Sequence, residues 1–172
     1  MMNRTIHLLA LLLITSVTSA QDFSWATLID TPTANEVAAL DTDDEGNVYL
    51  TGVYGADQFV PYNGTAYLTK TSPDGTPIWS KTLGADLIIG DMVCVDGQVI
   101  IVLQSTGDVT LEGETILEST DLTTMAILVL DEDGAYVSST AYPDYHGQYA
   151  DLATDGETVA LLRIVENNFL RA

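Results

Sequence analysis

Acidic side chains alternate along the stretch DTDDEGNVYLTG, residues 41–52, at a spacing that could hold a calcium ion. Asp41, Asp43 and Glu45 occupy its first, third and fifth positions and Gly46 the sixth, as in a helix–loop–helix calcium loop. The twelfth position, where such a loop has a bidentate Glu, is Gly52, and residues typical of a strand follow the sixth. The alternative interpretation is an acidic turn that leads into a strand, and the sequence favours the turn. Calcium is the one cofactor that the sequence suggests.

A second candidate site is aromatic. Tyr142, Tyr145 and Tyr149 lie in the stretch AYPDYHGQY and could form a patch that binds a protein or a glycan, although such rings also pack between sheets. His146 in the same stretch is the single histidine after residue 20, and no Gly-x-Ser-x-Gly context accompanies it. One histidine and one cysteine are too few for a zinc site. We therefore expect no catalytic residues.

Residues 1–20 are typical of a secretory signal peptide. Arg4 precedes an apolar run from Leu8 to Val17, and small residues lead to a cleavage site after Ala20. The apolar run is about ten residues long, whereas a membrane-spanning helix needs about 20. We expect a secreted, periplasmic or cell-surface protein without a membrane span, in which residues 21–172 form one domain.

The chain is strongly acidic and holds one cysteine. Its formal net charge is −20, which excludes nucleic acid and anionic lipid as partners and otherwise favours solubility. Cys94 lies in the apolar run LIIGDMVCV, where a buried thiol is expected rather than a reactive one.

Two kinds of turn signal recur and alternate along the chain. An acidic residue plus glycine opens an apolar strand at 45–46, 96–97 and 155–156. A strand, an Asp-Gly turn and a second strand occur at 66–84 and 125–143, with Gly75 and Gly134 separated by 59 positions (75 to 134). The stretch around Trp25 matches the one around Trp79, and Val137 takes that place in the later copy. This order predicts repeated units of about four short strands.

The predicted fold is all-β and β-propeller-like: about two full four-stranded antiparallel blades plus partial blades, in an incomplete ring. A leftover outer strand would lie around Trp25. The other expected strands are 37–40, 47–52, 66–71 and 78–83 for the first blade, 88–95, 98–104, 125–130 and 135–140 for the second, and 149–154 and 158–165 for a partial third.

The segments DDEGNVYLTG (43–52) and AYLTKTSPDGTPIWSKTLG (66–84) together resemble the SBBP-type β-propeller repeat of secreted bacterial proteins. The second copy, with DGQVIIVLQ and Val137 in place of tryptophan, resembles it more loosely. The resemblance implies a propeller fold and an extracellular or surface location, with no catalytic residues.

The sequence thus favours a non-catalytic interaction or surface scaffold whose partner is a protein or glycan at the cell surface. Two alternatives stay open: the N-terminal part of a larger exported enzyme, and a calcium-stabilised adhesion module. An incomplete ring leaves strand edges and apolar faces uncovered, so we also expect self-association when the chain is expressed alone.

Overall fold

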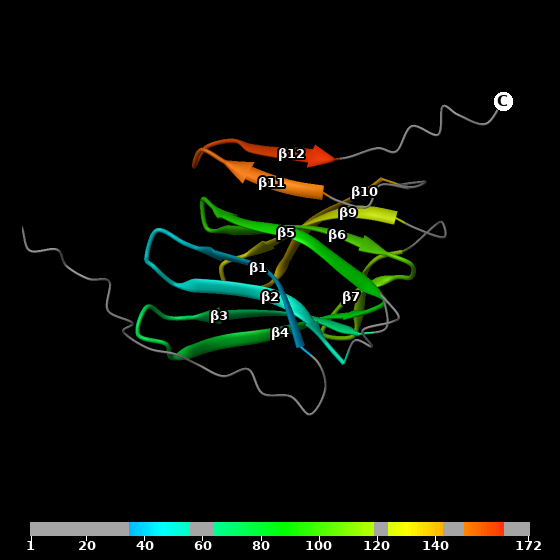
Figure 1. Ribbon diagram of the computed structural model, residues 1–172, viewed down its shortest axis with the longest axis horizontal. Coiled ribbons are helices and arrows are strands. Elements are labelled where there is room, and N and C mark those ends of the chain that lie inside the picture. Colours follow the sequence, from blue (N-terminus) through cyan, green and yellow to red (C-terminus); the bar gives the residue numbers. More distant parts are fainter. Residues whose placement is uncertain (1–34, 56–63, 119–123, 143–149, 164–172) are drawn as a thin grey trace, which may run out of the picture.

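The structure is a computed structural model that describes residues 35–55, 64–118, 124–142 and 150–163. Throughout these ranges the chain forms antiparallel strands joined by turns (Figure 1). The strands are β1 (Asn35–Thr42), β2 (Val48–Tyr54), β3 (Thr65–Thr71), β4 (Pro77–Ala85), β5 (Leu87–Val95), β6 (Gln98–Ser105), β7 (Val109–Leu111), β8 (Glu114–Leu117), β9 (Thr124–Asp131), β10 (Tyr136–Tyr142), β11 (Ala150–Thr154) and β12 (Val159–Arg163).

Two sheets have four strands each and are built alike. The first sheet has the order β1-β2-β3-β4, and the second follows the equivalent order β5-β6-β9-β10. The hairpin β11–β12 forms a third sheet, and the short hairpin β7–β8 a fourth. Period-2 alternation of apolar and polar residues gives each strand one face for one neighbouring sheet and one face for the other.

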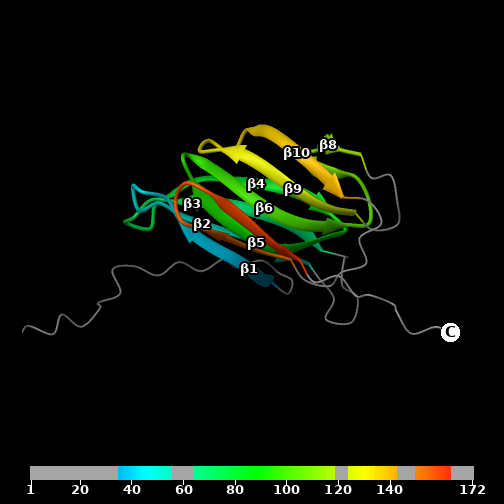
Figure 2. The same ribbon diagram turned by 90° about the horizontal axis from the view of Figure 1, so that it is seen from above.

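The first three sheets are stacked face to face (Figure 1). Side chains of β1–β4 and of the second sheet share the larger core, which includes Leu68, Leu83, Ile101 and Leu128, all at most 1 % exposed. The opposite face of the second sheet packs on β11–β12 through Val102, Met125 and Leu152, among others. Figure 2 shows β11 and β12 lying across β5 and β6, in agreement with the contacts between β11 and both strands.

The first strands of the three stacked sheets are neighbours. β5 contacts β1 on one side and β11 on the other, so these strands lie side by side along one margin of the stack. At the far margin, hairpin β7–β8 lies against β4, where the Glu112 amide donates to the Thr82 carbonyl at 2.9 Å and the Thr82 amide donates to Oε1 of Glu112 at 2.6 Å. The hairpin therefore covers part of the outer edge of the first sheet.

All ten strands expected from residue 37 onward are confirmed where the structure describes them, as are the antiparallel four-stranded sheets. Hairpin β7–β8 was not expected, because its strands have only three and four residues and too little alternation to stand out. Residues 1–20, the strand predicted around Trp25, and positions 149, 164 and 165 lie outside the described residues. Within the described ranges there is no helix of the length and hydropathy that a membrane span requires.

Gly52 is required where β2 passes β1 and β3. A Cβ atom at this position would lie 2.0 Å from the Glu36 carbonyl oxygen and 2.9 Å from the Tyr67 hydroxyl oxygen. Because the first of these atoms belongs to the backbone of a paired strand, it cannot move aside cheaply. We expect Gly52→Ala to lower the free energy of unfolding by about 1–3 kcal/mol or more in urea titrations. Gly107→Ala, where a Cβ would meet nothing within 4 Å, is the matched control. Equal effects of the two substitutions would contradict this packing.

Candidate functional site

The acidic stretch that suggested a calcium site folds as a five-residue turn, Asp43–Asn47. Turns of this type occur three times in the described residues. In each turn the first residue's amide donates to the fifth residue's carbonyl, the fourth residue's amide donates back to the first, and the fourth residue is a glycine with φ between 74° and 87°. A side-chain oxygen of the first residue accepts from the amide of the fifth. The three turns are Asp43–Asn47, Ser72–Thr76 and Asp131–Ala135.

This common build changes the interpretation of the acidic turns. From the sequence, the acidic-glycine turns at residues 45–46, 96–97 and 155–156 form one group, in which the acidic residue before the glycine is the common feature. In the structure the decisive side chain is the one three residues before the glycine: Asp43, Ser72 or Asp131. Asp96-Gly97 is a different, two-residue turn in which both residues have positive φ, 49° and 70°. Sequence reasoning missed this grouping because Ser72 differs in type from the two aspartates.

Asp43 is the centre of a partly buried polar cluster. One of its oxygens, Oδ1, accepts from the amides of Glu45 at 3.1 Å and Asn47 at 2.8 Å. The other, Oδ2, accepts from Asn47 Nδ2 at 2.8 Å and from the Tyr49 hydroxyl at 3.3 Å, and lies 3.5 Å from the Lys70 ammonium. Burial alone would raise the pKa of Asp43, but the hydrogen bonds from Asn47 and the charge of Lys70 outweigh it and lower that pKa.

Lys70 connects this cluster to the second sheet. Its Nζ lies 5.0 Å from the centroid of the Tyr49 ring and donates to the Glu132 carbonyl, in the β9–β10 turn, at 3.3 Å. Trp79 Nε1 donates to the same carbonyl at 3.0 Å, and the Trp79 ring meets Tyr49 edge to face at 5.9 Å. Two side chains of the first sheet, Lys70 and Trp79, thus anchor a turn of the second, and Tyr49 packs against both. We call Tyr49, Lys70, Trp79 and the Glu132 carbonyl the inter-sheet clip.

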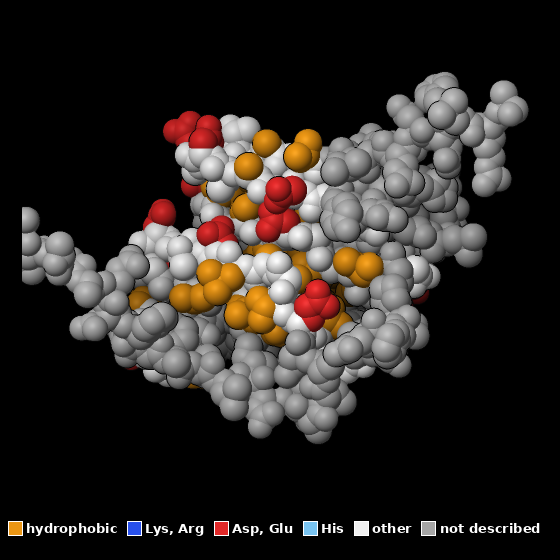
Figure 3. Space-filling model, in the orientation of Figure 1, with side chains coloured by type: hydrophobic (Ala, Val, Ile, Leu, Met, Phe, Trp, Pro, Cys, Tyr) orange, Lys and Arg blue, Asp and Glu red, His pale blue; other side chains and the backbone are white. Residues whose placement is uncertain are grey.

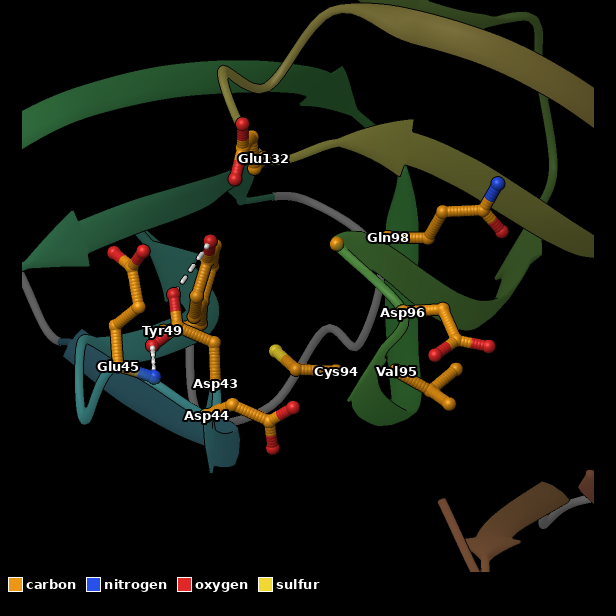
Figure 4. Close-up of a pocket in the computed structure, with 10 residues that line it drawn as sticks. Asp43, Asp44, Glu45, Tyr49, Cys94, Val95, Asp96, Gln98 and Glu132 are labelled. Atoms are coloured by element: carbon orange, nitrogen blue, oxygen red, sulfur yellow. Dashed lines mark hydrogen bonds between the residues drawn. The ribbon is translucent and has the colours of Figure 1, made fainter. Parts of the chain in front are cut away.

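A pocket of about 190 Å³ opens beside Asp43, between the β1–β2 turn and the β5–β6 turn. Figure 4 shows its lining residues, with the carboxylates of Asp44, Glu45, Asp96 and Glu132 around it. A negative potential of this kind attracts cations and repels anionic substrates. No pair of groups for nucleophilic catalysis is present in the pocket lining.

The one thiol in the pocket is chemically quiet. Cys94 lies in β5, and burial, with the nearby carboxylates of Asp41 and Asp43, raises the pKa of its thiol to about 12. Only the thiolate is a strong nucleophile or metal ligand, so this side chain takes no part in such chemistry near neutral pH.

Carboxylates also join the first strands of successive sheets. Asp41 Oδ2, on β1, accepts from the Cys94 amide of β5 at 2.7 Å. Asp91 Oδ2, on β5, accepts from the Leu152 amide of β11 at 2.8 Å. Burial raises the pKa of Asp91, and the carboxyl group of Asp151, whose Oδ1 accepts from the same amide at 3.1 Å, adds to the rise. The sequence gave no signal for these bonds because the partners are 53 and 61 residues apart.

The structure gives the three calcium candidates different neighbours. Asp41 binds β5, Asp43 binds its own turn and Lys70, and Glu45 Oε2 lies 3.4 Å from Asn47 Nδ2. Across the described ranges, no three His, Cys, Asp or Glu side chains gather closely enough to hold a metal ion. The turn interpretation therefore has the support of these contacts, and calcium binding stays an untested hypothesis.

Of the three candidate tyrosines, the structure describes one. Tyr142 ends β10 and is half-buried against the core between the second sheet and β11–β12. Tyr145, Tyr149 and His146 lie outside the described residues. The contacts of Tyr142 are those of a packing residue, and the binding patch stays a prediction.

No protein-family model matches this chain, and no characterised protein matches its sequence.

The hydrogen bonds from Asn47 to Asp43 and the ion pair of Asp43 with Lys70 make stability depend on pH. Because the pKa of Asp43 is lowered, its ionised form stabilises the fold at every pH above the unfolded-state value of about 3.9, and this stabilisation is lost as pH falls through the folded-state value. Asp43→Asn keeps an oxygen for the turn but removes the charge. We expect a loss of about 1–2 kcal/mol at pH 7 that shrinks toward pH 3 in chemical denaturation.

Asp131→Asn is the matched control for this variant. It changes the same position of an equivalent turn, whose carboxylate accepts only from the Asp133 and Ala135 amides among the bonds recorded for it. We expect a smaller loss of stability at pH 7 than for Asp43→Asn, because the described contacts of Asp131 include no ion pair. A loss equal to that of Asp43→Asn would contradict the role of Lys70.

The Cys94 thiol should resist modification in the folded protein. It is the only cysteine in the chain, so labelling reports on this position alone. We expect alkylation at pH 8 to be slower by at least about tenfold in the folded than in the urea-unfolded chain, since one unit of pKa changes the thiolate fraction about tenfold. Equal rates would contradict the burial and charge assigned to Cys94.

Proposed function

We propose that this chain is an exported, non-catalytic repeat domain of the β-propeller type that serves as an interaction or surface scaffold. The observation that carries the proposal is the repeated link between first strands, Asp41 to Cys94 and then Asp91 to Leu152. Strands joined in this way lie on one side of a face-to-face stack, as the innermost strands of successive propeller blades do around a central axis.

The internal repeat supports the same proposal. The first two sheets have equivalent strand orders, and the β3–β4 and β9–β10 turns have the same hydrogen bonds. The resemblance of residues 43–52 and 66–84 to the SBBP-type repeat adds an expected location outside the cytoplasm, in accord with the signal peptide predicted at residues 1–20. The inter-sheet clip gives a reason for tryptophan in the repeat, since Trp79 holds the next sheet's turn.

The chemistry of the described surface favours binding over catalysis. The polar cluster around Asp43 is used to hold the turn and the second sheet, and the Cys94 thiol is protonated. The formal charge of −20 makes a cationic or neutral protein or glycan a better partner than an anionic one. Loops and sheet faces would provide the contact.

Export and surface binding test this proposal together. The full chain is expressed with residues 1–20, the extracytoplasmic fraction is collected, and the N-terminus of the product is sequenced. We expect the product to begin at Gln21. The purified product, fluorescently labelled, is then applied to intact cells of the producing strain before and after their treatment with protease or glycosidase.

Saturable binding that one of these treatments abolishes supports a scaffold with a protein or glycan partner. A product that keeps residues 1–20 and remains inside the cell contradicts export. An exported product that binds no cell surface contradicts the scaffold role.

A further inference from the structure

The two ends of the stack of sheets carry exposed apolar side chains. At one end, the register of the first sheet places Leu40, Leu50 and Thr69 on the face that points away from the second sheet. Leu40 is 59 % exposed, and Ile78 on β4, next to the inward-facing Trp79, is 50 % exposed. We call this surface the outer face of the first sheet.

At the other end, hairpin β11–β12 has an open face of its own. Leu152, Val159 and Leu161 pack on the second sheet. The alternate residues therefore point the other way, and all of them are exposed: Asp151, Ala153, Ala160 and Leu162. Leu162 is 66 % exposed, more than any other large apolar side chain in the described ranges. Three of these four outward residues are apolar.

Both surfaces are visible in Figure 3. Apolar side chains gather over β1 and β2 and again over β11 and β12, and the described charged side chains in this view are acidic.

The packing inside the chain shows what each surface fits. Val99 and Ile101, two and four residues after Gly97, have no exposed area and pack on the first sheet. Val48 and Leu50, two and four residues after Gly46, are the equivalent positions of the first sheet and are only half-buried. The outer face of the first sheet is therefore equivalent to the face by which the second sheet packs on the preceding sheet.

The same reasoning identifies the complementary surface. The inward face of the first sheet receives the second sheet, and the far face of the second sheet receives β11–β12. The outward face of β11–β12 is next in this series. Each sheet thus packs one of its faces on the previous sheet and offers its opposite face to the next sheet. Among the three stacked sheets, two faces have no described sheet packed on them: the outer face of the first sheet, which is of the first type, and the outward face of β11–β12, which is of the second.

We propose that copies of this chain bind one another head to tail, with the outer face of the first sheet of one copy against the outward face of β11–β12 of the next. Such a contact is heterologous: it uses two different surfaces, and it closes into a ring or continues as a filament according to the rotation per copy. The inference uses the packing of the described sheets and not the proposed role at the cell surface, so either can fail without the other.

The charge of the chain sets the conditions for assembly. Two copies with a formal charge of −20 each repel at low ionic strength. In about 1 M salt the screening length falls to about 3 Å, and apolar contact dominates. We expect the mass measured by light scattering to rise with protein concentration, and more steeply at high salt than at low salt.

Two variants, one for each surface, test the contact. Leu40→Glu blocks the first-sheet face and Leu162→Glu blocks the β11–β12 face. Each variant alone should stay monomeric in sedimentation velocity under conditions in which the unmodified chain assembles. Mixed in equal amounts, they should form a one-to-one dimer and nothing larger, because each retains the surface that the other lacks. Formation of the dimer also shows that both variants are folded.

Val137→Glu is the matched control. Val137 lies on β10, at the edge of the second sheet opposite β5, is 47 % exposed, and receives the same change of charge. We expect this variant to assemble as the unmodified chain does. A monomeric unmodified chain at all salt and protein concentrations overturns the proposal. So does a mixture of the two blocked variants that stays monomeric, or a Val137→Glu variant that fails to assemble.

Discussion

The contact between the first two sheets depends on the buried ammonium group of Lys70. It lies between the Asp43 carboxylate of its own sheet and the Glu132 carbonyl of the next, and it is only 7 % exposed. A charge this far from water is tolerated only when it is paired and hydrogen-bonded. The Asp43 turn, the Tyr49 ring and the β9–β10 turn therefore have to meet at one point, which fixes how the second sheet lies on the first.

The clip also explains a difference between the two repeats. Trp79 holds the Glu132 carbonyl, and a Cβ at Gly134 would meet the Trp79 ring at 3.3 Å, so the turn of the second sheet lies directly on this side chain. In the second sheet the register places Ser138, and not Val137 as the sequence comparison suggested, at the equivalent position. Trp79 pairs with Lys70 and Ser138 pairs with Val129, each four residues after the glycine of its turn, and Ser138 is exposed. Among the described residues, β11–β12 brings no such turn to it. The larger aromatic side chain stands where a neighbour covers it, and the smaller one stands where the described chain leaves it open.

At the other margin of the stack, carboxylates satisfy strand edges. The first strand of each sheet has one edge that its own sheet does not use, and unpaired amides there would cost free energy or invite other strands. Asp41 and Asp91 accept from amides on the next first strand, so the acidic composition has a structural use beyond solubility. The repulsion between Asp91 and Asp151 is the cost of placing two carboxyl groups at one amide.

The sequence by itself determined the local structure. Period-2 alternation with β-branched and aromatic residues specified ten strands, and glycines with positive φ, such as Gly46, Gly75 and Gly134, specified the turns. Both signals arise within a few residues of the chain, so they do not depend on which other strands lie nearby.

Only the tertiary structure decided which partner each acidic side chain binds. The spacing of Asp41, Asp43 and Glu45 suggested one shared ion, but the fold directs Asp41 to β5 and Asp43 to Lys70. Those partners lie on other strands, and strand spacing along the chain carries no information on which backbone amide or ammonium group a carboxylate will reach.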